Sequence, residues 1–102
     1  MVKRLADQPT EHSLSSYIAE YPDLDHLHVR RRGAVLTLES GPKDDPFPHA
    51  RFRRDTVYLW RLEMPVHGGK RWDKTPFRAP LEDLFTTVVE KFPWMLLSPY
   101  AK

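Results

Sequence analysis

A chain of 102 residues with 40% hydrophobic and 12% aromatic residues holds enough apolar material for one small folded domain over residues 1–102, which excludes a disordered chain. There is no cysteine, which excludes a disulfide framework, a thiol nucleophile and a thiolate metal site. The net charge of +2 is unevenly spread, because residues 26–78 carry twelve cations and six acids, a net +6.

The first ten residues, MVKRLADQPT, are expected to be frayed, because Pro9 interrupts any element that begins there. They are cationic but lack the apolar run of a secretory signal. No later segment approaches the ~20 consecutive apolar residues of a membrane span. We therefore predict no membrane association and a cytoplasmic location.

A short helix is predicted after this segment. Leu14, Tyr17 and Ile18 recur at helical spacing. Ser13 precedes them and is a candidate N-cap, since its side chain can accept a hydrogen bond from the first free amides of the helix. Pro22 disfavours helical backbone at the residue before it, so the helix should end there.

A first hairpin is predicted in HLHVRRRGAVLTLES, where residue type alternates on both sides of Arg32 and Gly33. A tight turn at these two residues places Val29 opposite Leu36 and gathers apolar side chains on one face. The following segment, from Gly41 to Pro48, is rich in proline and acids and is expected to be a loop.

A second hairpin is predicted from the segments HARFRR and VYLWRLEM. A three-residue loop of Arg54, Asp55 and Thr56 places Phe52 opposite Tyr58 and keeps the bulky residues on one side. A two-residue turn would split those residues between the two faces, so the longer loop is favoured.

A fifth strand is predicted within GGKRWDKTPFRAPLEDL. Gly68 and Gly69 reverse the chain, and Pro76 confines the strand to a sheet edge because proline donates no ladder hydrogen bond. The stretch does not match a phosphate-binding loop of the nucleotide-hydrolase type, since Arg71 occupies the position of the required Ser or Thr.

A long amphipathic helix is predicted between Pro80 and Pro93, with acids in its first turn and a lysine in its last. Its apolar stripe follows helical spacing over three turns. The stripe comprises Leu81, Leu84, Phe85, Val88, Val89 and Phe92. Because no other element offers as much apolar surface, this helix should cover the sheet.

Together these elements predict a two-layer α+β fold, an antiparallel meander of four to five strands with one face covered by the C-terminal helix and a short N-terminal helix. The covered face should carry Leu27, Val29, Leu36, Leu38, Phe52, Tyr58, Trp60 and Leu62. Trp72, beside the glycine turn, is either a ligand-stacking residue or a residue that closes the end of the core, and the core role is favoured. The apolar tail, residues 93–102, carries Trp94, Met95, Leu96 and Leu97 and is expected to dock on its own domain or, as the second choice, to mediate homodimerisation.

The other face of the sheet is predicted to be basic and open to solvent. Its candidate ligand-binding residues are His26, His28, Arg30, Arg51, Arg53, Arg61 and, depending on the register of the last strand, Arg71. Guanidinium groups can neutralise the phosphates of RNA or DNA, although Glu39 and Glu63 lie among them and can pair with them. The aromatic side chains on which single-strand RNA binders stack bases are expected on the covered face.

Three functions are compatible with this pattern. A non-catalytic binding domain for nucleic acid is favoured over a protein-interaction or homodimerisation module, which would use Val35, Leu59 and the tail. The third is a small enzyme similar to ribonuclease toxins, with His28 or His67 as the acid–base group among the arginines. That similarity is one of size and basic character only, so no catalytic residue is assigned.

A metal site is less favoured. His26 and His28 lie on one side of a strand, as metal ligands can, and His49 or Asp25 would be the third ligand. No spacing fixes that third ligand, so we predict neither a metal nor a cofactor and favour surface histidines paired with Glu39.

Overall fold

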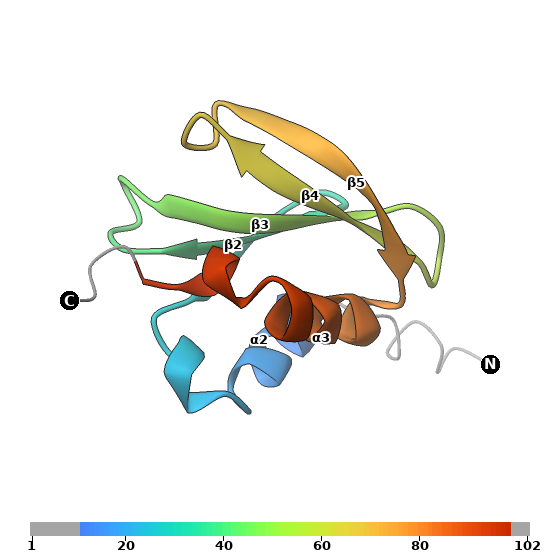
Figure 1. The fold of residues 1–102 in the computed structure, drawn as a ribbon, viewed down its shortest axis with the longest axis horizontal. Helices are drawn as coiled ribbons and strands as arrows, with labels where there is room; N and C mark the ends of the chain where they lie inside the picture. Colours follow the sequence, from blue (N-terminus) through green and yellow to red (C-terminus); the bar gives the residue numbers. More distant parts are fainter. Residues whose placement is uncertain (1–10, 99–102) are drawn as a thin grey trace.

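The computed structural model of the chain describes residues 11–98, so the expected fraying of residues 1–10 lies outside the described part. A five-stranded antiparallel sheet in the order β1-β2-β3-β4-β5 forms one layer, and the described helices lie against one of its faces (Figure 1). Its strands are β1 (His28–Arg32), β2 (Val35–Ser40), β3 (Phe47–Arg54), β4 (Trp60–Val66) and β5 (Arg71–Ala79). The predicted α+β meander, with the proline-containing fifth strand at an edge, is confirmed.

The second layer consists of α2 (Glu11–Ile18), η1 (Pro22–Leu24), α3 (Leu81–Lys91) and η2 (Pro93–Leu96), the two η segments being short 3-10 helices. Ser13 lies inside α2, so its prediction as the N-cap is wrong. A serine within the first turn looks the same in a sequence as a capping serine. Glu11, which precedes it, already supplies the negative charge that the first turn of a helix favours.

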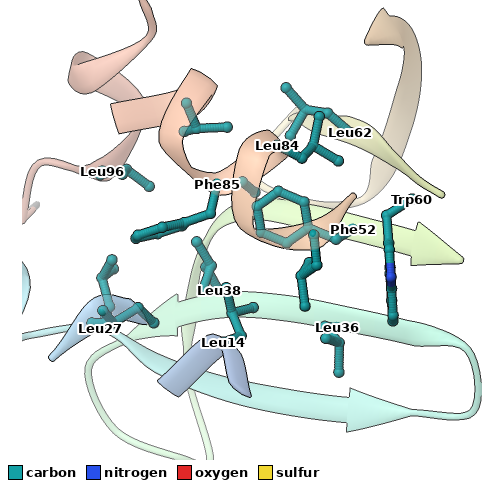
Figure 2. Packing of buried hydrophobic residues seen from close by; sticks show 14 residues of the cluster. Leu14, Leu27, Leu36, Leu38, Phe52, Trp60, Leu62, Leu84, Phe85 and Leu96 are labelled. Atoms are coloured by element: carbon teal, nitrogen blue, oxygen red, sulfur yellow. The ribbon is translucent and has the colours of Figure 1, made fainter. Parts of the chain in front are cut away.

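Helix α3 contributes the centre of the hydrophobic core, as its apolar stripe predicted. Four residues of the stripe are almost fully buried, namely Leu81, Leu84, Phe85 and Val88. They belong to one cluster with Leu36, Leu38, Phe52 and Leu62 of the sheet and Leu14 of α2 (Figure 2). The helix layer therefore seals one face of the sheet and leaves the other face to solvent.

The first hairpin has the predicted faces but a different register. Its turn is at positions 33 and 34, where Gly33 adopts a φ of +59°. Val29 consequently lies opposite Leu38 and not Leu36, so the predicted pairing is wrong by two residues. A shift by two leaves every side chain on its original face, because strand side chains alternate with a period of two.

The second hairpin has a longer loop than predicted. Residues 55–59 form it, closed by the amides of Asp55 and Thr56, which donate to the carbonyl of Leu59 at 2.8 and 3.1 Å. Phe52 therefore lies opposite Leu62. The predicted placement of Tyr58 on the covered face is wrong, since it lies in the loop and is 61% exposed.

Strand β3 begins two residues earlier than expected, within the predicted loop from Gly41 to Pro48. Pro48 lies opposite Glu39, and the register shifts between Leu38 and Glu39, which marks a bulge. The bulge interrupts the regular ladder next to Pro48, and proline, which lacks a backbone donor, is tolerated at such irregular positions. The bulged residue is His49, which is 2% exposed.

His49 ties the C-terminal segment to the sheet. Its Nδ1 lies 2.7 Å from the carbonyl oxygen of Met95, which can only accept, so Nδ1 carries the proton. Nε2 is then the acceptor for the Ser40 hydroxyl at 2.8 Å. Leu96, beside this contact, is 2% exposed within the core. The tail thus docks on its own domain through Leu96.

Burial lowers the pKa of His49 below its ordinary value of 6.5, against the opposing effect of the hydrogen bond to Met95; the nearby His26 and His28 lower it further. In the unfolded chain the His49 imidazole becomes protonated near pH 6.5, whereas in the folded chain its lowered pKa disfavours protonation. The stability of the fold should therefore decrease as the pH drops below about 6.5. Thermal denaturation between about pH 7.5 and about pH 5.5 measures this. His49→Gln, which cannot titrate there, should show a shallower decline; an equal slope would contradict the assignment.

Candidate functional site

The face of the sheet opposite the helices carries an open hollow of about 500 Å³. Among its lining residues are Arg30, Arg32, Glu39, Arg51, Arg53 and Trp72. No helix among residues 11–98 lies over this face (Figure 1). Pockets of this volume are in the range that holds small ligands, so the hollow is large enough to be a candidate binding site.

The register of the sheet arranges the cations of this face in two rows that cross the strands. One row consists of Arg32, Val35, Arg53, Arg61 and Arg78, each opposite its neighbour on the next strand. The other consists of Arg30, Thr37, Arg51, Glu63 and Lys74. Because neighbouring strands lie about 4.8 Å apart, each row extends over roughly 20 Å.

Glu39 of β2 anchors the cations at one end of the face. It is 6% exposed, and its Oε1 accepts a hydrogen bond from Arg30 Nε at 3.1 Å. Nε2 of His28, the residue opposite on β1, lies 3.4 Å from the same oxygen. Arg30 Nη2 also donates to the carbonyl of Lys43 at 3.2 Å. The guanidinium is therefore held on two sides while part of it remains exposed.

Glu63 of β4 does the same on the other side of the central strand β3. It is 1% exposed and accepts hydrogen bonds from Arg51 Nε at 2.7 Å and from Arg53 Nε at 3.0 Å. One carboxylate thus faces two guanidinium groups, and the trio keeps a net positive charge. Each arginine has donors beyond those used by the carboxylate, so both can bind an external oxyanion.

Other cations on this face are not neutralised by a carboxylate. Arg32 and Lys74 are exposed and form no ion pair within residues 11–98. Farther along the first row, Asp55 from the β3–β4 loop pairs with Arg61 at 3.7 Å and with Arg78. The face is therefore cationic overall, and its positive charge is least compensated at Lys74 and at Arg32, which lines the hollow.

Five of the seven predicted ligand-binding residues lie on this face, namely His28, Arg30, Arg51, Arg53 and Arg61. His26 lies elsewhere, with Nε2 2.7 Å from the carbonyl oxygen of Leu96 on the helix side of the sheet. It precedes β1, so strand alternation does not govern its direction. Arg71 is also off the face, since it lies opposite Val66 and forms an ion pair with Asp73 at 3.5 Å.

Trp72 lies on the open face and not at the end of the core, so its predicted place is wrong. It lies opposite Pro65 and shares its side of β5 with Lys74. Its ring is 4.5 Å from the guanidinium carbon of Arg51, a cation–π contact. The face on which a β5 residue lies follows from the β4 residue opposite it, and the sequence does not show which residue that is. Arg32 was missed because it was predicted to be a turn residue.

The β4–β5 turn closes one end of the hollow. Gly68 and Gly69 adopt φ values of +69° and +91°, as expected for the glycine turn. A side chain at Gly69 would place its Cβ 2.6 Å from Cγ of Pro48. Pro48 belongs to β3, so it is not free to move aside. The turn approaches β3 this closely because Gly69 has no side chain.

No group of three or more His, Asp or Glu side chains within residues 11–98 has an arrangement that holds a metal ion. His67 lies in the β4–β5 turn, outside the lining of the hollow, with a φ of +55°. Among the same residues no helix has the length and apolar character to cross a bilayer.

Comparison of the chain with protein-family models, with curated proteins and with solved structures yields no match in any of the three.

Proposed function

We propose that the protein is a non-catalytic domain that binds nucleic acid through the open face of its sheet. The observation that carries this proposal is the hollow lined by Arg30, Arg32, Arg51 and Arg53, with the one lining carboxylate, Glu39, almost fully buried. Guanidinium groups bind phosphates through paired N–H donors, and they remain charged at every physiological pH.

The spread of the cations favours a polymer over a single small anion. Rows of roughly 20 Å across five strands are longer than one phosphate group needs, and they suit several successive phosphates of a chain. An acidic protein segment would find the same charges, but its carboxylate side chains offer no planar ring for Trp72. A cytoplasmic location, expected from the sequence, would bring the domain into contact with nucleic acid.

A titration of fluorescently labelled RNA and DNA oligonucleotides at two salt concentrations tests the proposal. With three or four phosphate contacts, the logarithm of the binding constant should fall with the logarithm of salt concentration with a slope between about −2 and about −4. If no oligonucleotide binds at low salt, or if the affinity does not change with salt concentration, nucleic acid is not the ligand.

The homodimerisation alternative remains a prediction with one observation in its favour. Trp94 and Leu97 are 61% and 67% exposed beside the docked Leu96. Phe47 is exposed beside them, but a stable interface buries about 800 Å² on each partner, and three exposed side chains supply only a part of that. The basic face, where several arginines line one hollow, supports nucleic-acid binding better.

The ribonuclease alternative is supported least. His28 directs Nε2 at Glu39, where the atom is buried from solvent. His67 lies in the β4–β5 turn outside the hollow. General acid–base cleavage needs two groups within reach of one phosphodiester, and these two histidines do not share the hollow. A binding domain therefore fits the arrangement better than an enzyme.

A further inference from the structure

The contact between Arg51 and Trp72 is a prepared stacking surface inside the hollow. The guanidinium carbon of Arg51 lies 4.5 Å from the centre of the Trp72 ring. Arg51 is fixed from behind, because its Nε and Nη2 both lie 2.7 Å from Glu63 Oε1. Both Arg51 and Trp72 line the hollow, so the pair is accessible to a ligand.

The place of Trp72 is hard to explain by folding alone. It lies on the edge strand β5, outside the hydrophobic cluster, and is only partly buried. Aromatic rings and guanidinium planes are the groups on which proteins stack unpaired bases, and each stacked base contributes appreciable affinity whatever its identity. The phosphate-binding cations Arg32 and Arg53 line the same hollow, so one nucleotide can reach both kinds of contact.

A double helix cannot make this contact without disruption. Its bases are stacked on one another in the interior, and a protein that needs the face of a base must unstack it. A flexible single strand can instead place one base in the hollow and its phosphates over the arginine rows.

We infer that the ligand is single-stranded nucleic acid, one base of which stacks on the Trp72–Arg51 pair while the flanking phosphates contact Arg32 and Arg53. This inference rests on the proposed function and adds the strand state and the base-stacking residue. Because stacking is tolerant of base identity, the preference is for exposed bases and not for a sequence.

The test compares three labelled ligands of equal length and equal phosphate number per strand: a single strand, the same strand in a duplex, and a strand of abasic residues. The wild-type protein should bind the single strand roughly 5- to 100-fold more tightly than the abasic strand. Trp72→Leu should lose this preference and keep its affinity for the abasic strand. Trp72→Phe, which retains an aromatic ring, should keep most of the preference for the single strand over the abasic strand.

Trp94→Leu is the matched control, since Trp94 is an exposed tryptophan that does not line the hollow. It should leave all three affinities unchanged, and circular dichroism of each variant checks the fold. If the wild-type protein binds the single strand, the duplex and the abasic strand equally, the inference is wrong and the proposed function stands. If it binds none of them at low salt, both are wrong.

Discussion

Val88→Asp is expected to unfold the domain. Val88 is fully buried at the centre of α3, in the cluster that joins the helix to the sheet. The substitution forfeits the burial of a valine, about 1.5 to 3 kcal/mol, and places an unpaired carboxylate in an apolar site, which adds a further large penalty. Small domains are stable by only about 5 to 15 kcal/mol, so little or no folded protein should remain.

Thermal denaturation followed by circular dichroism measures this effect. At about 4 to 8 °C per kcal/mol for a domain of this size, Tm should fall by at least about 15 °C if a transition is still seen. Thr87→Asp adds the same charge one residue earlier, at a partly exposed position of the same helix, and should shift Tm by only a few degrees. An unchanged Tm for Val88→Asp would refute the packing of α3 on the sheet.

The second large effect is expected from Arg32→Glu combined with Arg53→Gln. Both side chains line the hollow, and neither belongs to the hydrophobic cluster, so the fold should survive. The glutamine keeps an amide that can donate to Glu63, which avoids placing two carboxylates together. Two charge-assisted contacts are removed, at about 1.5 to 3 kcal/mol each, so oligonucleotide affinity should fall at least roughly 100-fold.

The salt dependence of binding gives an independent measure of the same change. Loss of two phosphate contacts should reduce the magnitude of the slope by about 1.4 for a single strand. Lys91→Glu combined with Arg71→Gln changes net charge by the same amount at positions off the face, one on α3 and one opposite Val66. If this control weakens binding as much as the hollow variant does, net charge and not the face is responsible.

The fold class followed from the sequence because it depends on patterns that tolerate error. In both hairpins the predicted register was wrong, yet the shifts were by even numbers of residues. Even shifts keep Phe52, Trp60 and Leu62 on the covered face, since side chains alternate with a period of two. The face on which these three residues are buried, which is the face that α3 covers, was therefore predicted correctly although the residue pairs were wrong.

Positions near turns and bulges could not be predicted in the same way. Tyr58 left the sheet because the β3–β4 loop is closed by hydrogen bonds to the Leu59 carbonyl, which no residue pattern announces. His49 turned to the core side because the bulge shifts the ladder beside it. On β5, Trp72 and not Arg71 lies on the open face. This could not be predicted, because the sequence does not show which β4 residue lies opposite each β5 residue. The charge of the candidate site was thus predicted, whereas its aromatic residue, Trp72, was considered as a stacking residue but assigned to the core.

The two nearly buried glutamates have a consequence for the speed and selectivity of any association. Long arginine side chains normally lose considerable rotational freedom when they meet a partner, about 1.5 to 2 kcal/mol each. Glu39 and Glu63 already restrain Arg30, Arg51 and Arg53, so much of that loss has occurred during folding. The same restraint limits how far these guanidinium groups can move to fit different anions. The surface should therefore select anions whose oxygen atoms match the fixed positions of the arginines and should not bind every polyanion equally.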